Sequence, residues 1–241
     1  MKITLHKKIA EYFGYEFVKI SRMAYRDANS HLMRLFELLH INCVFDVGAN
    51  MGQYAEYLRK IGYQGLIVSF EPVSQCYEYI KRLENEKWKI VNVGLGKEAA
   101  LVDINVAKKT VFSSFLEPND YSVRRFHESA SIERHEKVKV ERLDDVINQL
   151  IQEIKEPCIF LKLDTQGYDL EVLKGANKSL QYIAGIQTEI SCKAIYKGMP
   201  THIESLTYLH NLGYEITNIF PLSHDKNDMS LLEFDCILRK K

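Results

Sequence analysis

The sequence has few cysteines and no cysteine motif, which excludes several classes of small protein. The five cysteines among its 241 residues are Cys43, Cys76, Cys158, Cys192 and Cys236, and no two of them form a C-x-x-C pair. This spacing excludes a zinc ribbon or a thioredoxin motif and argues against a disulfide scaffold. Reduced thiols in a cytoplasmic protein are the simplest interpretation.

Net charge and long apolar runs are also missing. Lys and Arg together number 32, as do Asp and Glu, so broad electrostatic binding to nucleic acid is not expected. The apolar runs are too short for a transmembrane helix, and the first ten residues lack the apolar centre of a secretory signal. Repeats, low-complexity tracts and Pro/Gly-rich linkers are absent from the sequence as well. We expect a cytoplasmic globular protein with one main domain.

Short apolar runs alternate with segments of helical spacing along most of the chain. The runs cover residues 43–48, 66–70, 88–93, 158–163 and 185–190, and this alternation predicts an α/β fold with a doubly wound, mostly parallel sheet. Thr201 and Glu204 have the spacing of a capping box at the start of a helix. Two final strands, 214–220 and 233–239, have no helix between them, so we expect an antiparallel edge.

Two segments depart from this alternation. Residues 100–106 alternate as a half-exposed strand does, whereas residues 108–137 are polar and mixed, with Val138 and Val140 marking a short strand after them. A loop this long in a compact domain is usually a functional lid or disordered, so we predict a lid insertion at 108–137. The main domain is then expected to span residues 41–241.

Residues 1–40 form a separate unit with an approximate apolar stripe of Leu5, Ile9, Phe13, Phe17 and Ile20. The stripe predicts a helical extension that either docks on a membrane surface or partner or packs against the sheet edge or over the active site. We favour packing, because acidic residues interrupt the polar face. Peripheral membrane contact through 1–40 and a homodimer remain open alternatives.

Two strand ends indicate a nucleotide-like ligand. Residues 46–52 (DVGANMG) follow the first strand with G-x-x-x-G spacing rather than G-x-G-x-x-G, so no pyrophosphate cradle is implied. Glu71 ends the second strand, nineteen residues after Gly52, where a carboxylate can accept hydrogen bonds from ribose hydroxyls. S-adenosylmethionine fits a site with these features. Its ammonium is expected to meet Asp46 or another acceptor, and its carboxylate the backbone N–H groups of the turn.

An ordered series of motifs then resembles the FkbM family of S-adenosylmethionine-dependent methyltransferases, over roughly residues 41–239. The series contains FDVGANMGQY (45–54), SFEP (69–72), VNVGLGK (91–97), SSFL (113–116), ERLDD (141–145), FLKLDTQGYDLEVLKGA (160–176), IQTEIS (186–191), Tyr196, Gly198 and DCIL (235–238). The resemblance implies a class I methyltransferase sheet of seven strands with the last antiparallel. It also implies O-methylation of a hydroxyl on a sugar, glycan or polyketide.

The candidate cofactor-binding residues come from the segments that match the family and from their neighbours. They are Asp46, Gly48, Ala49, Asn50, Gly52, Tyr54, Glu71, Pro72, Asn92, Gly94, Ser113, Ser114 and Asp164. Because they follow consecutive strands, we expect most of them to lie at one edge of the sheet.

Three residues are candidates for catalysis. Asp164 ends the strand that neighbours the first strand across the switch point, so it is the first candidate for a base or for an acceptor that orients the hydroxyl. Its alternative role is to cap the following helix. Glu189 lies on the next strand. With Asp145 or Asp169 as a third ligand, these two carboxylates could instead hold a divalent cation, although the lack of a D-x-D pair or histidine cluster leads us to predict no metal.

The remaining candidates concern the acceptor. Gln166, Gly167 and Glu189 are candidate substrate contacts, as are Arg124 and Arg125, which could bind a phosphate of an activated sugar. His127 and His135 lie in the predicted lid and could act as a base near neutral pH; His127 is our third catalytic candidate. Lys162 precedes Asp164 and is expected to pair with a carboxylate.

The sequence thus predicts an S-adenosylmethionine-dependent O-methyltransferase acting on a carbohydrate hydroxyl of a glycan, glycolipid or nucleotide sugar. One alternative moves the methyl group to a polyketide or other small metabolite. Another is a non-catalytic cofactor-binding or scaffolding protein of the same fold. A nicotinamide dehydrogenase is disfavoured for want of G-x-G-x-x-G.

Overall fold

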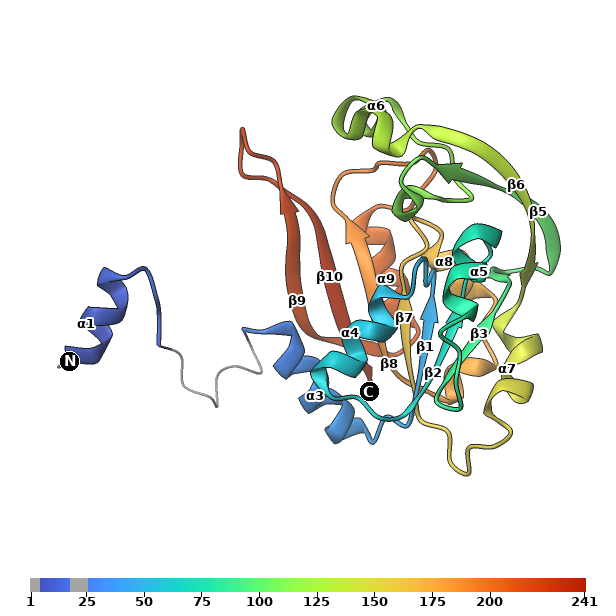
Figure 1. Ribbon diagram of the computed structural model, residues 1–241, viewed down its shortest axis with the longest axis horizontal. Coiled ribbons are helices and arrows are strands. Elements are labelled where there is room, and N and C mark those ends of the chain that lie inside the picture. Colours follow the sequence, from blue (N-terminus) through green and yellow to red (C-terminus); the bar gives the residue numbers. More distant parts are fainter. Residues whose placement is uncertain (1–4, 18–25) are drawn as a thin grey trace.

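A seven-stranded sheet forms the centre of the computed structural model, which describes residues 5–17 and 26–241 (Figure 1). Its strands lie in the order β3-β2-β1-β7-β8-β10-β9. They are β1 (Cys43–Val47), β2 (Leu66–Phe70), β3 (Trp88–Val91), β7 (Ile159–Leu163), β8 (Ile183–Ser191), β9 (Tyr214–His224) and β10 (Leu231–Lys240). The doubly wound prediction is confirmed. The antiparallel strand β10 lies one position inside the edge, between β8 and β9.

Helices cover both faces of this sheet. Because successive side chains of a strand point to opposite faces, Val44 and Phe45 of β1 belong to two separate hydrophobic cores. Val44 packs with α3 (Ala28–Leu39), α4 (Gln53–Ile61) and α5 (Ser74–Lys81); Phe45 packs with α7 (Leu143–Ile151), α8 (Asp169–Lys174) and α9 (His202–Asn211). The predicted capping box of Thr201 and Glu204 is present at the start of α9. Burial on both faces explains why the central strands are mostly apolar.

A second, three-stranded sheet follows β3, in the order β4-β6-β5. It consists of β4 (Gly94–Leu95), β5 (Ala100–Ala107) and β6 (Ile132–Glu141), and α6 (Asp120–Phe126) lies between β5 and β6. The prediction that a strand begins only near Val138 is wrong, because β6 starts at Ile132. Its first half alternates exposed and half-buried polar residues, so no apolar period marks it. Pairing with β5, as in Asn105 with His135, forms the strand instead.

The N-terminal part contains α1 (Leu5–Tyr12), which lies away from the sheet in Figure 1. Gly14, with a φ of 77°, follows the end of the helix, so Phe13 and Phe17 of the predicted stripe lie beyond it. Ile9 and Phe13 are 51% and 66% exposed, and Ile20 lies outside the described residues. It is α3 that packs on the sheet. Across 5–17 and 26–241, every helix is too short or too polar to cross a membrane.

Candidate active site

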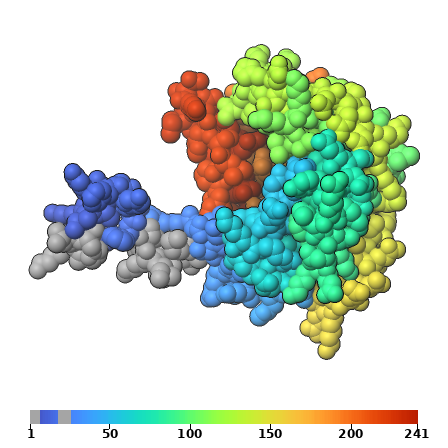
Figure 2. Space-filling model, viewed as in Figure 1, coloured from blue at the N-terminus to red at the C-terminus, as the bar shows by residue number. Residues whose placement is uncertain are grey.

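A cavity of about 560 Å³ lies at the carboxyl ends of the central strands. In Figure 2 a hollow separates the β9–β10 hairpin, in red, from the green residues around α6. The turns after β1, β2 and β7 line one side of the cavity, the segment between β5 and β6 lines another, and β8 and β10 form a third wall. Because β1 lies between β2 and β7, the strand order reverses here, which is where open α/β sheets bind ligands.

The turn after β1 is closely packed and internally bonded. A Cβ on Gly48 would lie 2.1 Å from the carbonyl oxygen of Asp164, so only glycine allows the β1 and β7 turns to meet. The N–H groups of Gly48 and Ala49 both donate to the carbonyl oxygen of Phe70, at 3.1 Å. Asn50 donates its N–H to Glu71. These N–H groups are therefore used within the protein, contrary to the prediction that the turn binds a ligand carboxylate through them.

Glu71 is fixed at the edge of the cavity directly after β2. Its Oε2 accepts a hydrogen bond from the N–H of Asn50 at 2.7 Å, and its Oε1 accepts one from the N–H of Val73 at 2.8 Å. Burial raises the pKa of this carboxyl to about 8, although both N–H donors favour the ionised form. Each carboxylate oxygen keeps a further lone pair. Glu71 is thus a rigid acceptor for hydroxyl groups of a ligand.

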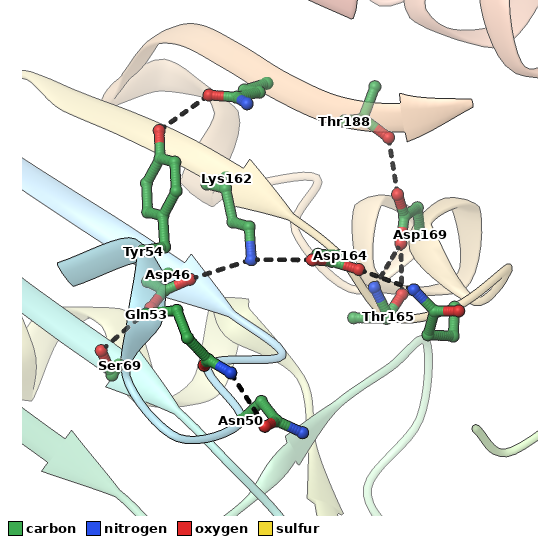
Figure 3. A network of polar contacts seen from close by, with 12 residues as sticks. Asp46, Asn50, Gln53, Tyr54, Ser69, Lys162, Asp164, Thr165, Asp169 and Thr188 are labelled. Carbon is green, nitrogen blue, oxygen red and sulfur yellow. Dashed lines mark hydrogen bonds and ion pairs between the residues drawn. The ribbon is translucent and has the colours of Figure 1, made fainter. Parts of the chain in front are cut away.

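Lys162 joins Asp46 of β1 to Asp164 in the turn after β7 through two ionic contacts (Figure 3). Its Nζ lies 3.2 Å from Oδ1 of Asp46 and 3.3 Å from Oδ2 of Asp164, and 5.1 Å from the centre of the Tyr54 ring. Burial alone would lower the pKa of Lys162, but Asp164 and Asp46 outweigh it and raise that pKa. Lys162 is therefore a permanent cation and does not act as a base.

Asp46 is a buried anchor for this lysine and does not line the cavity. Its Oδ2 accepts a hydrogen bond from Oγ of Ser69 at 3.2 Å, and Trp88 Nε1 donates to the same Ser69 oxygen at 2.9 Å. Burial raises the pKa of Asp46, and Lys162 opposes that shift. Asp46 therefore acts on a ligand only through Lys162.

Asp164 is held from both sides. Besides the contact with Lys162, its Oδ1 accepts a hydrogen bond from Nε2 of Gln166 at 2.9 Å. The Tyr196 hydroxyl lies 3.0 Å from Oε1 of Gln166 and 2.9 Å from the carbonyl oxygen of Phe112, and Ser114 Oγ donates to the Gln166 carbonyl. The segment after β5 thereby orients the turn that carries Asp164.

The two alternative roles for the carboxylates of this turn find no support. Helix α8 has Tyr168 at its N-cap, so the alternative that Asp164 caps it is wrong. Asp169 accepts hydrogen bonds from the N–H and hydroxyl of Thr165 and, at 2.6 Å, from the hydroxyl of Thr188. Within the described ranges no group of three or more His, Cys, Asp or Glu side chains is placed to hold a metal ion. Asp145 lies apart from this turn, in α7.

The third wall of the cavity is acidic. Glu189 of β8 stands opposite Asp235 of β10 in the antiparallel register, and Gln187 and Glu233 line the same wall. The Tyr54 hydroxyl donates to Oε1 of Gln187 at 2.8 Å, and Gln187 hydrogen-bonds Asp235. In the part of the chain that the structure describes, no hydrogen bond or ion pair engages the carboxylate of Glu189. It is free to meet a ligand.

Burial and like charge act together on this wall. Burial, followed by the charges of Asp164, Glu233 and Asp235, raises the pKa of Glu189 well above its ordinary value. Burial also raises the pKa of Asp235, to about 6, against the hydrogen bond from Gln187. Glu189 therefore binds a proton more strongly than a solvated carboxylate does.

Most residues predicted for the site line the cavity. They are Gly48, Ala49, Asn50, Tyr54, Glu71, Pro72, Gly94, Ser113, Ser114, Asp164, Gln166 and Glu189. Three others support it from outside: Gly52 precedes α4, the Asn92 amide donates to the Glu71 carbonyl, and Gly167 borders a small adjoining pocket.

The basic candidates lie elsewhere. Arg124 and Arg125 belong to α6 and His127 to the turn after it, and none of them lines the cavity. His135 lies on β6 and is exposed. Since none of these cations reaches the cavity, the structure gives no phosphate-binding site of the predicted kind.

Sequence reasoning did not assign Gln187, Glu233 or Asp235 to the site. A signal was present: Glu233 and Asp235 alternate with Phe234 and Cys236, which face a core. Glu233 and Asp235 therefore point to the opposite face of β10. Acidic residues are unusual inside a sheet that helices cover on both faces, so they indicate a polar cavity.

Comparison with known proteins decides the family. A model of the FkbM methyltransferase domain matches residues 46–216. The chain belongs to the FkbM methyltransferase family. Methyltransferase sdnD of Sordaria araneosa is 28% identical over 196 residues, which cover 72% of this chain and 74% of that protein. Methyltransferase 1 of Beauveria bassiana is 28% identical over 145 residues, 55% of this chain and 57% of that protein.

Solved methyltransferases are similar at lower identity. The plantazolicin methyltransferase BamL, in complex with a triazolic desmethylPZN analog and SAH, is 11% identical with a TM-score of 0.49, covering 92% of this chain and 87% of its own. A SAM dependent methyltransferase from Aquifex aeolicus is 14% identical with a TM-score of 0.43, covering 98% of both chains. The cofactor of this FkbM methyltransferase is S-adenosylmethionine.

Replacing Glu71 by alanine is expected to weaken binding of S-adenosylmethionine by about 10–100-fold, because hydrogen bonds to a charged group contribute about 1.5–3 kcal/mol. The change also frees the N–H groups of Asn50 and Val73 that shape the turn. Calorimetric titration measures the effect. Glu78→Ala, an exposed change on α5, is the matched control; equal affinity of the Glu71 and Glu78 variants would contradict the assignment.

Proposed function

We propose that this FkbM methyltransferase transfers a methyl group to a hydroxyl of an uncharged carbohydrate, as a free sugar, glycan or glycolipid. When bound, S-adenosylmethionine supplies an electrophilic methyl group on a sulfonium. The protein then has to hold the acceptor in line with that group, exclude water and accept the hydroxyl proton. Orientation of this kind contributes roughly 7–11 kcal/mol to lowering a reaction barrier.

The residues present fit the cofactor. The carboxylate of Glu71 would accept hydrogen bonds from the ribose hydroxyls, and the apolar side chains of Val73, Leu95 and Phe115 would enclose the adenine. All four line the cavity. Asp164, which lines the cavity beside Lys162, would attract the ammonium group. Asp164 thus takes the role that the sequence predicted for Asp46, because Asp46 does not line the cavity.

The single observation that carries the O-methylation proposal is the unengaged carboxylate of Glu189 at the cavity wall. A general base must reach the acceptor hydroxyl and must bind its proton. Both carboxylate oxygens of Asp164 are already engaged, Oδ2 by Lys162 and Oδ1 by Gln166. Among the described residues no hydrogen bond or ion pair engages the carboxylate of Glu189, and burial raises its pKa. We therefore assign the base to Glu189 and an orienting role to Asp164.

The acidic wall also supports the acceptor class. Glu189, Glu233 and Asp235 together offer several hydrogen-bond acceptors, and a sugar offers several hydroxyl donors at similar spacing. The same charges repel a phosphate, and Arg124 and Arg125 lie outside the cavity. A carbohydrate without phosphate therefore fits better than a nucleotide sugar.

The test is methyl transfer from isotopically labelled S-adenosylmethionine to a panel of acceptors. The panel contains neutral sugars and glycolipids, the same sugars as phosphates, and hydroxylated polyketides. We expect label in the neutral carbohydrates, and a strong reduction with the Glu189→Gln variant. Transfer to polyketides alone would move the acceptor class to the small-metabolite alternative. Labelling of nitrogen rather than oxygen, shown by mass spectrometry of the product, would overturn O-methylation.

A further inference from the structure

Negative charge exceeds positive charge in the cavity. The acidic residues among its described lining are Glu71, Asp164, Glu189, Glu233 and Asp235. Lys162 is the only lysine or arginine in that described lining. The charge of Lys162 is already paired with Asp46 and Asp164. The acidic wall formed by β8 and β10 therefore has no cation of its own within the described lining.

The charged groups that act on Glu189 come from three elements. Asp235 and Glu233 lie on β10, with Asp235 directly opposite in the register; Asp164 follows β7, and Asp169 begins α8. The field of each of them opposes ionisation of Glu189. Burial, followed by the charges of Asp164, Glu189 and Glu233, raises the pKa of Tyr196, so its hydroxyl stays neutral.

We propose that Glu189 carries a proton in the cofactor-free protein and releases it when the positively charged methyl donor enters the cavity. Asp235 is a positioning residue in this scheme, because its negative charge on the facing strand keeps Glu189 basic. The base is thereby made available only when the donor is bound. The inference rests on the proposed role of Glu189 in O-methylation.

The scheme balances over one turnover. The O–H bond of the acceptor breaks and its proton goes to Glu189, an electron pair of the oxygen forms the bond to the methyl carbon, and the pair of the carbon–sulfur bond remains on sulfur. The sulfonium charge has then disappeared, so the protonated form of Glu189 is again the favoured one. The wall thus returns to the state it had before the donor bound.

The experiment is calorimetric titration with S-adenosylmethionine in two buffers of equal pH and different ionisation enthalpy. The difference in heat counts the protons released. Because an α-amino group titrates near pH 8, the ligand's own contribution is removed by subtracting the result for Glu189→Gln. The remaining release should approach about one proton per site at pH values between the pKa of Glu189 in the complex and its higher pKa in the free protein. It should fall at pH values below and above this window. S-adenosylhomocysteine, which lacks the sulfonium charge, should release less.

Two variants make the result decisive. Asp235→Asn lowers the pKa of Glu189 in the free protein, so the window of proton release should move to lower pH. Glu78→Gln on α5, an exposed control, should leave it unchanged. Wild-type binding without proton release at any pH, or equal release by wild type and Glu189→Gln, would overturn the inference. Failure of the proposed function has a different signature, namely normal release without methyl transfer to any hydroxyl.

Discussion

Replacing Lys162 by methionine is expected to lower the free energy of unfolding by about 3–5 kcal/mol, the usual cost of removing one partner of a buried ion pair. Lys162 is 7% exposed and Asp46 is fully buried, so the variant leaves a carboxylate without its cation beneath the active site. Urea denaturation of the purified protein measures the loss. Lys89→Met is the matched control, because Lys89 pairs with an exposed Glu153. Such surface pairs contribute at most about 1 kcal/mol.

The loss should depend on pH in a defined direction. Without Lys162, the pKa of Asp46 rises further above its value in the unfolded chain. A group of this kind contributes stability at low pH that is lost as the pH rises through the folded pKa. The variant should therefore be closer to wild type at pH 5 than at pH 8. The double variant Asp46→Asn, Lys162→Met should recover much of the stability at pH 8; equal instability at both pH values would contradict the ion-pair explanation.

Replacing Glu189 by glutamine is expected to lower kcat by about 10²–10⁴-fold, the range over which general bases contribute. The amide keeps the size of the side chain and removes its ability to take a proton. Affinity for S-adenosylmethionine should change little at pH values below the window of proton release, where Glu189 keeps its proton in the free protein and in the complex. Single-turnover methyl transfer to the acceptor identified by labelling is the measurement. For wild type, turnover should rise with pH as Glu189 ionises.

The comparison with Asp164→Asn separates the two carboxylates. Asp164 is expected to act on the cofactor, so its variant should weaken S-adenosylmethionine binding more than Glu189→Gln does. The pH dependence of turnover should survive in Asp164→Asn and disappear in Glu189→Gln. If Asp164→Asn instead removed the pH dependence, Asp164 would be the base and Glu189 a substrate contact.

The sequence predicts the central sheet and the strand-end residues well, for a physical reason. β1, β2 and β7 are buried on both faces, so their apolar runs stand out whatever surrounds them. A polar residue directly after such a run must lie at the carboxyl edge of the sheet. That rule is enough to place Glu71 and Asp164 at the mouth of the cavity from the order of the residues alone.

What the sequence does not show depends on contacts between distant residues. The Tyr196 hydroxyl meets Gln166 and Phe112 only after three separate segments have folded together. Asp235 joins the wall because β10 inserts beside β8 and sets it opposite Glu189. Strand β6 has too little apolar period to be recognised and is specified by its partner β5. The basic candidates of the predicted lid, Arg124, Arg125, His127 and His135, do not line the cavity, because local sequence says nothing of where α6 and β6 lie.

The single tryptophan of the chain gives this protein an optical reporter of its own active site. Trp88 is buried, packs against Gly52 at the start of α4, and donates its indole N–H to Ser69, which bonds Asp46 beneath Lys162. Because the chain has only one tryptophan, the fluorescence of Trp88 carries no contribution from another indole. Any change in the field around Asp46 and Lys162 reaches the emitting ring through two hydrogen bonds, so ligand entry can be followed in real time without a label.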